Sequence, residues 1–74
     1  MIKEYDRVKT LGPKDGYPAG MIGVAVDIHE AMGGCEVEIW DETDYPMDVV
    51  AFAFDELVVI DPKDYGKEHS PFVD

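Results

Sequence analysis

The sequence predicts an all-β domain that folds as one small five-stranded barrel. Five short stretches are rich in apolar residues, and some of them alternate apolar and polar side chains with the period of a β-strand. Glycine and proline separate these stretches, as turns between short strands require. No stretch sustains the helical period of roughly 3.6 residues, and 74 residues provide for one domain with one core.

The central strand is predicted at residues 21–29, within a stretch that begins at Gly20. Alternation places four apolar side chains on one face of this strand, namely Ile22, Val24, Val26 and Ile28. Gly20 and Gly23 allow the backbone to bend or a neighbouring strand to approach closely. We therefore expect this strand to form the middle of the sheet.

A second strand is predicted at residues 35–41, joined to the first by a turn at residues 31–34. The turn ends in Gly33-Gly34, which can adopt the positive φ angles of tight hairpin turns. Alternation predicts that Cys35, Val37 and Ile39 face the core, whereas Glu36, Glu38 and Trp40 face away from it. Cys35 is the only cysteine, so we expect a buried structural thiol rather than a disulfide or a metal ligand.

The first strand is predicted within residues 2–10, with Val8 facing the core. Its many charged residues suit a strand at the edge of a sheet. Residues 11–19 hold two glycines and two prolines and are predicted to form a loop. Tyr17 in this loop is expected to cover the core, and a ligand contact is the alternative.

Two further strands are predicted at residues 48–54 and 57–60, joined by a short 3₁₀ turn at Asp55-Glu56. In the first of them, alternation places Val50, Phe52 and Phe54 on one face and Val49, Ala51 and Ala53 on the other. The small residues of the second face would allow another layer to pack closely. Pro62 ends the last strand, because proline cannot donate to the hydrogen-bond ladder.

The predicted boundary between the barrel and a C-terminal tail lies at residue 61. The barrel covers residues 1–61, and the tail at 62–74 is polar and holds two prolines. We expect this tail to be loosely held, with Tyr65 or Phe72 as its anchor.

The charge of the chain is strongly negative. Seventeen Asp and Glu residues face six Lys and Arg residues, for a net charge of -11. No Lys or Arg lies between Lys14 and Lys63, an interval that holds 12 of the 17 acidic residues. Binding to nucleic acid needs clustered cations, so we expect no nucleic-acid partner. An acidic surface also repels anionic lipid and attracts basic proteins, so a basic protein is the expected partner.

The N-terminal residues lack the apolar segment of a signal peptide, and no apolar run approaches the roughly 18 residues of a membrane span. We therefore expect a cytoplasmic protein without membrane contact. The expected oligomeric state is a monomer or a weak homodimer.

Four segments resemble a family of small bacterial SH3-like barrel domains of unknown function. They are residues 4–8, 20–26, 35–39 and 54–57. The Gly-x-x-Gly-x-x-Val pattern of the second segment is similar to the KOW-type strand of ribosomal and transcription-factor barrels. The resemblance covers residues 3–61 and implies a strongly bent, five-stranded SH3-like barrel in a bacterial cytosolic protein. KOW domains that contact RNA do so through basic loops, whereas the corresponding loops of this chain are acidic.

The sequence offers no recognisable catalytic or metal-binding motif. His29 and His69 are the only histidines, and neither has an evident nucleophile and base beside it. Four carboxylates crowd residues 41–48, namely Asp41, Glu42, Asp44 and Asp48. They could attract Ca²⁺, but the glycine and final glutamate of an EF-hand loop are missing, so solvated carboxylates are expected. We predict no enzyme activity, no cofactor and no metal site.

The candidate partner-binding site combines the outward side of the 35–41 strand with the loop after it. Its six residues are Glu36, Glu38, Trp40, Asp41, Glu42 and Asp44. Tryptophan is favoured as an interface anchor, and charges at the rim steer encounter. The alternative is that Trp40 closes one end of the barrel over Met47 or Tyr5.

These features predict an acidic protein-binding module that docks a basic protein surface. A concrete version is an immunity or antitoxin protein that covers the basic active site of a nuclease toxin. The alternative is an accessory subunit or chaperone of a bacterial metal enzyme, because similar barrels occur in nitrile hydratase assemblies. A small enzyme is the third hypothesis.

Overall fold

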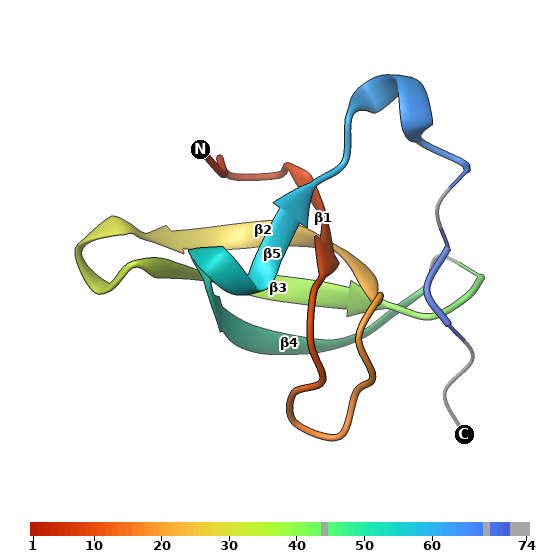
Figure 1. Cartoon of the computed structure of the whole chain (residues 1–74), viewed down its shortest axis with the longest axis horizontal. Coiled ribbons are helices and arrows are strands. Elements are labelled where there is room, and N and C mark those ends of the chain that lie inside the picture. Colours follow the sequence, from red (N-terminus) through yellow and green to blue (C-terminus); the bar gives the residue numbers. More distant parts are fainter. Residues whose placement is uncertain (44, 68, 72–74) are drawn as a thin grey trace.

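The chain folds into one five-stranded antiparallel sheet (Figure 1). The computed structural model describes residues 1–43, 45–67 and 69–71. The strands are β1 (Arg7–Thr10), β2 (Ile22–His29), β3 (Gly34–Trp40), β4 (Pro46–Ala53) and β5 (Leu57–Val59). The 3₁₀ segments are η1 (Glu30–Met32), η2 (Phe54–Glu56) and η3 (Pro62–Asp64). The described part of the chain contains no α-helix, so the predicted all-β fold and the 3₁₀ turn before the last strand are confirmed.

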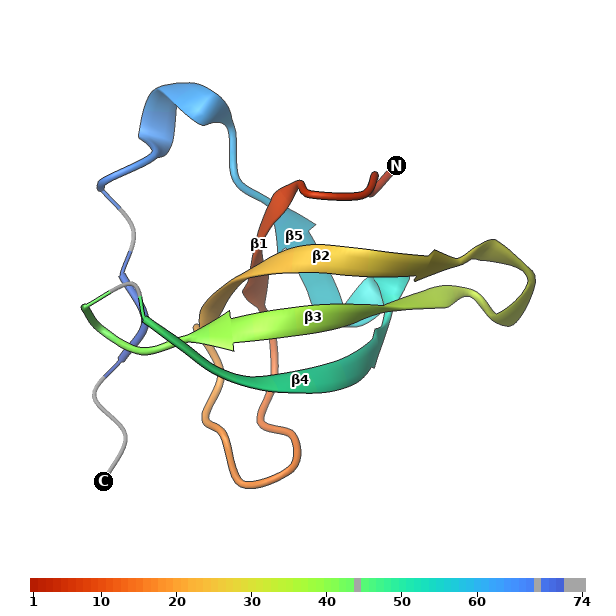
Figure 2. The same ribbon diagram turned by 180° about the vertical axis from the view of Figure 1, so that it is seen from behind.

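The sheet bends over a single core. Its strand order is β4-β3-β2-β1-β5, and in both views β1 and β5 cross the layer formed by β2, β3 and β4 (Figures 1 and 2). The buried core cluster consists of Ile2, Val8, Met21, Ala25, Cys35, Val37, Ile39, Val50, Phe52 and Leu57. Cys35 is buried as predicted for a structural thiol, and this burial raises the pKa of its thiol.

The face assignment predicted for β2 is wrong, because the strand contains a β-bulge at Val26. Ala25 pairs with Val37, but the next paired residue, Asp27, lies opposite Glu36. Val26 is therefore one extra residue, and it reverses the alternation of the residues beyond it. Gly23, Ala25 and Ile28 lie opposite the core residues Ile39, Val37 and Cys35, whereas Ile22, Val24, Asp27 and His29 belong to the other face.

β1 is an interior strand, although its charges predicted an edge. It pairs with β2 on one side and with β5 on the other, and it begins at Arg7 rather than within residues 2–6. Val8 faces the core as predicted and is fully buried. The edge strands are β4 and β5. The outward side of β4, at Val49, Ala51 and Ala53, is exposed, so no second layer of described residues packs on it.

The β2–β3 turn combines a 3₁₀ segment with one left-handed glycine. Gly33 follows η1 with φ of 71°, so it supplies the positive φ angle that the sequence predicted for this turn. Gly34 differs from the prediction, because it is the first residue of β3 and packs against the backbone of Phe52.

The loop between β1 and β2 covers one end of the barrel. Lys14 and Tyr17 exchange two backbone hydrogen bonds of 2.9 Å, which close the tip of the loop. The Tyr17 ring packs against the core, and its hydroxyl donates a 3.0 Å hydrogen bond to Asp48 Oδ2 of β4. The Asp48 carboxylate raises the pKa of the Tyr17 phenol through this bond. Tyr17 therefore covers the core, as predicted.

The tail returns to the sheet and provides a hydrogen-bond partner for the backbone of the first residue of β2. The Ile22 N–H donates a 2.6 Å hydrogen bond to Ser70 Oγ, and the Ser70 hydroxyl lies 3.3 Å from the Ile22 carbonyl oxygen, which accepts from it. Ser70 is buried, so its hydroxyl takes the place of solvent as the hydrogen-bond partner of the Ile22 backbone. Tyr65 also reaches the sheet, where its ring stacks against the Arg7 guanidinium at 4.5 Å. Phe72, the other predicted anchor, lies outside the described residues.

Glu56 links the last 3₁₀ turn to the β1–β2 loop and should make stability depend on pH. Its Oε1 accepts from the Ala53 N–H at 2.7 Å and from Lys14 Nζ at 3.0 Å. The Ala53 amide, and after it Lys14, lowers the pKa of this carboxyl below its ordinary value of 4.5.

We expect the stabilisation from Glu56 to be complete above the unfolded-state pKa and to disappear as pH falls through the lowered folded-state pKa. Glu56→Gln should therefore reduce the urea midpoint at pH 7 and have a smaller effect at pH 3. Asp55→Asn, at a neighbouring exposed carboxylate, is the control. An equal loss for Glu56→Gln at both pH values would contradict this linkage.

Candidate functional site

The outward-pointing residues of β2, β3 and β4 form a continuous surface, which we call the outer face. Residues directly opposite each other in antiparallel strands point to the same side of the sheet. The register gives three rows across the strands, namely Val24–Glu38–Val49, Asp27–Glu36–Ala51 and His29–Gly34–Ala53. The predicted outward direction of Glu36, Glu38 and Trp40 thus agrees with the burial pattern of β3.

Trp40 is held by its own chain at one end of the outer face. Its indole N–H donates a 2.9 Å hydrogen bond to Glu38 Oε1, and the Arg7 guanidinium lies 4.9 Å from its ring centroid. Arg7 also stacks on Tyr65, so the cation lies against one aromatic ring from the sheet and one from the tail. The structure therefore presents Trp40 as a half-buried part of a stacked cluster rather than as an open anchor.

The loop after β3 uses its first carboxylate to hold its own turn. Asp41 Oδ1 accepts hydrogen bonds from the Thr43 N–H, the Thr43 hydroxyl and the Tyr45 N–H, at 2.8, 2.7 and 3.0 Å. The Thr43 hydroxyl bond, followed by the bond from the Tyr45 amide, lowers the pKa of Asp41. Glu42 is exposed, and Asp44 lies outside the described residues. Of the loop residues predicted to bind a partner, the structure thus leaves Glu42 open to solvent.

The exposed part of the outer face combines an apolar row with carboxylates. Val49 is 50% exposed on the edge strand, and Ala51 and Ala53 follow it along β4 on the same side of the sheet. We call these three residues the apolar row. Glu38 and Glu36 lie directly across from Val49 and Ala51 on β3. The three strands contain no Lys or Arg. The sequence indicated the carboxylates of this surface, but the apolar row becomes part of it only once β4 is known to be an edge strand.

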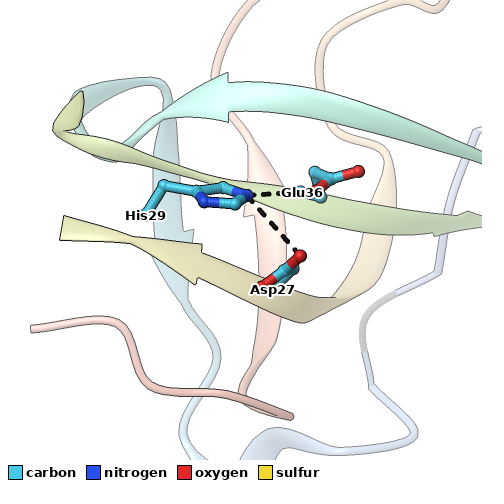
Figure 3. Close-up of side chains that lie close together, drawn as sticks. All are labelled: Asp27, His29 and Glu36. Carbon is cyan, nitrogen blue, oxygen red and sulfur yellow. Dashed lines mark hydrogen bonds and ion pairs between the residues drawn. The ribbon is translucent and has the colours of Figure 1, made fainter. Parts of the chain in front are cut away.

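A second group of side chains meets on the outer face where β2 and β3 pair beyond the bulge (Figure 3). His29 Nε2 lies 3.1 Å from Glu36 Oε2 and 3.6 Å from Asp27 Oδ2. The hydrogen bond with Glu36, and then the charge of Asp27, raises the pKa of His29 above its ordinary value of 6.5. The same bond with His29 lowers the pKa of Glu36. We call Asp27, His29 and Glu36 the bulge triad.

Sequence reasoning missed the bulge triad. The sequence pattern gives His29 no partner, and the crowded carboxylates that it indicates lie at residues 41–48 instead. Asp27 and His29 reach the outer face only because Val26 is bulged, and nothing in a single sequence marks that position.

An open hollow lies where the β2–β3 turn approaches β4. Its lining is mostly apolar and consists of Lys14, His29, Met32, Gly34, Cys35, Ala51, Phe52 and Ala53. The Lys14 ammonium lies 5.2 Å from the centroid of the Phe52 ring at this hollow. His69, the second histidine, is exposed in the tail.

Comparisons with known proteins provide no relative. No family model matches the chain, and no curated protein or solved structure matches it significantly. The resemblance to small bacterial SH3-like domains therefore stays a prediction. Within residues 1–43, 45–67 and 69–71, no helix has the length and apolar character needed to cross a membrane.

Proposed function

We propose that this protein is an acidic binding module and that its outer face docks a basic protein surface. The observation that carries the proposal is the pairing of β3 with β4. This pairing places Glu36 and Glu38 beside the exposed row of Val49, Ala51 and Ala53. Apolar contact area framed by charges of one sign is the usual composition of a protein interface with a charged partner.

The electrostatic part of the proposal rests on the distribution of charge. β2, β3 and β4 contain acidic residues and no Lys or Arg, and the Arg7 side chain of β1 reaches this surface only at its Trp40 end. Repulsion among these carboxylates disfavours the folded state, so a surface of this kind is more easily understood if a cationic partner relieves it. A nuclease active site is one such basic surface, because it is built to hold phosphate, and a row of carboxylates would imitate that charge.

The apolar part of the proposal rests on Val49 rather than on Trp40. Trp40 already contacts Arg7 and Glu38, whereas the Val49 side chain is 50% exposed and is the largest of the row that it forms with Ala51 and Ala53. A buried apolar contact at the middle of an interface contributes more to affinity than rim contacts do. We therefore assign the anchor to Val49 and the steering of encounter to Glu36 and Glu38.

The test is a capture of partners from the source cells, followed by binding kinetics with the purified partner. Glu36→Lys combined with Glu38→Lys should slow association about tenfold or more at low salt, because steering by charge is lost. The deficit should shrink as salt rises, since charges are screened beyond about 10 Å at 0.1 M salt. Val49→Ser should mainly speed dissociation, because it removes buried contact area.

The matched control is Glu4→Lys combined with Asp55→Lys. This pair changes the net charge by the same amount at two exposed residues outside β2, β3 and β4. If both charge reversals slow association equally, the partner senses only the total charge and the outer face is not the docking surface. If neither of them nor Val49→Ser changes the kinetics, the partner binds elsewhere, and the loop at residues 12–18 is the next candidate.

A further inference from the structure

In the bulge triad, two carboxylate oxygens face the single hydrogen that His29 Nε2 can carry. Oxygens of Glu36 and Asp27 approach the same imidazole atom, Nε2 of His29, at 3.1 and 3.6 Å. A protonated Nε2 carries a single hydrogen, which can point well at only one of the two oxygens. The second carboxylate therefore gains charge attraction without a well-directed hydrogen bond.

These separations suit a metal ion bound to all three side chains. One ligand atom from each residue lies within 4.8 Å of the others. Bonds of about 2.0–2.2 Å from a tetrahedral zinc ion to nitrogen and oxygen require ligand atoms about 3.3–3.5 Å apart. The separations of 3.1 and 3.6 Å at Nε2 bracket that value, and rotation of the exposed carboxylates can adjust the third.

The scaffold of the triad is a pair of hydrogen-bonded strands rather than a loop. Asp27 lies directly across from Glu36, and His29 follows two residues later on the same side of β2. The Val26 bulge turns both β2 residues outward, and bulges often re-aim side chains at functional sites. The side chains of Asp27, His29 and Glu36 remain 60%, 44% and 41% exposed, which leaves room for water to complete the coordination.

We propose that Asp27, His29 and Glu36 bind a divalent transition-metal ion of the zinc type through Oδ, Nε2 and Oε. An imidazole favours zinc over the harder Mg²⁺ and Ca²⁺, which take oxygen ligands. The strongly acidic surroundings favour any cation, and the imidazole provides the selectivity. The three protein ligands leave at least one coordination position to water, which is the arrangement of an open rather than a closed zinc site. This site shares Glu36 with the proposed docking surface, but zinc binding is measured without any protein partner, so either proposal can fail without the other.

The experiment titrates metal-free full-length protein with ZnCl₂ in 0.15 M NaCl, by calorimetry and by NMR of the histidine rings. We expect one saturable zinc equivalent and a shift of the His29 ring signals, while the His69 ring signals stay in place. His29→Ala, Glu36→Gln and Asp27→Asn should each weaken zinc binding about tenfold or more. MgCl₂ and CaCl₂ in the same buffer should not displace the zinc.

Two substitutions provide matched controls. His69→Ala removes the other imidazole, and Glu30→Gln removes an exposed carboxylate next to the triad in sequence. Both should bind zinc like the wild type. Circular dichroism in EDTA checks that each variant is folded. If His29→Ala does not fold, His29→Gln is used in its place.

Three results would overturn the proposal. One is the absence of saturable zinc binding by the wild type. Another is binding that survives both His29→Gln and Glu36→Gln, or that Ca²⁺ displaces, which would indicate diffuse attraction to the acidic surface. The third is an unchanged His29 ring signal in the zinc-saturated wild type, a result that is independent of any variant.

Discussion

Gly23→Val is expected to destabilise the fold by about 3 kcal/mol or more, which is the cost of severe overpacking in a core. A domain of this length has only about 4–11 kcal/mol of total stability, so much of the chain would be unfolded at moderate temperature. The cause is a close approach of two strands. A Cβ at Gly23 would overlap the carbonyl oxygen of Glu38 and lie 2.8 Å from Val37 Cγ1.

Gly12→Ala is the matched control for this prediction. No atom lies within 4 Å of a Cβ at Gly12, and its φ angle is not in the left-handed region. Urea denaturation followed by circular dichroism should show a large loss for Gly23→Val, an intermediate loss for Gly23→Ala and little change for Gly12→Ala. Equal midpoints for Gly23→Ala and Gly12→Ala would show that the backbone of β3 can retreat without cost.

Insertion of one alanine between Glu36 and Val37, opposite the bulge, is expected to be the other severely destabilising change, also by about 3 kcal/mol or more. The inserted residue would pair with Val26 and remove the bulge, and regular alternation would then turn Asp27 and His29 toward the core and Ile28 toward solvent. A carboxylate forced into an apolar core without a partner costs several kcal/mol, and the alternative is a sheet that loses its pairing beyond Ala25.

Val26→Ala distinguishes the effect of the number of residues in the paired strands from the effect of the Val26 side chain. It keeps the bulge and removes only a half-buried apolar group, so a loss of about 1 kcal/mol is expected. The same urea unfolding measurement compares both variants with the wild type. If the insertion is no worse than Val26→Ala, the two strands accommodate the inserted residue without a change of faces, and the bulge does not set the register.

The contrast between β3 and β2 shows what alternation can and cannot predict. In β3 the polar residues Glu36 and Glu38 interrupt the apolar residues, so a one-residue slip would bury charge and the faces are unambiguous. In β2 the run from Ile22 to Ile28 is almost wholly apolar, so either register is acceptable locally. The outcome depends on tertiary pairing with Val37 and Glu36.

The features of the candidate sites also divide into those that one strand predicts and those that depend on how the strands pair. The outward carboxylates of β3 were predictable, because they follow from the alternation of one strand. The tail contact between Ser70 and Ile22 joins residues 48 positions apart and has no local signal. The bulge triad and the stacking of Arg7 on Trp40 also join different strands, so they required the register.

Trp40 gives this protein a native optical probe. It is the only tryptophan in the chain, and its ring lies beside Arg7, which in turn contacts Tyr65 of the tail. Detachment of the tail would change the solvation of the indole while the sheet stays intact. Indole emission therefore reports partial opening at the C-terminal segment, and far-ultraviolet circular dichroism reports the strands. Comparing the two signals along one denaturation curve separates local release of the tail from global unfolding without any label.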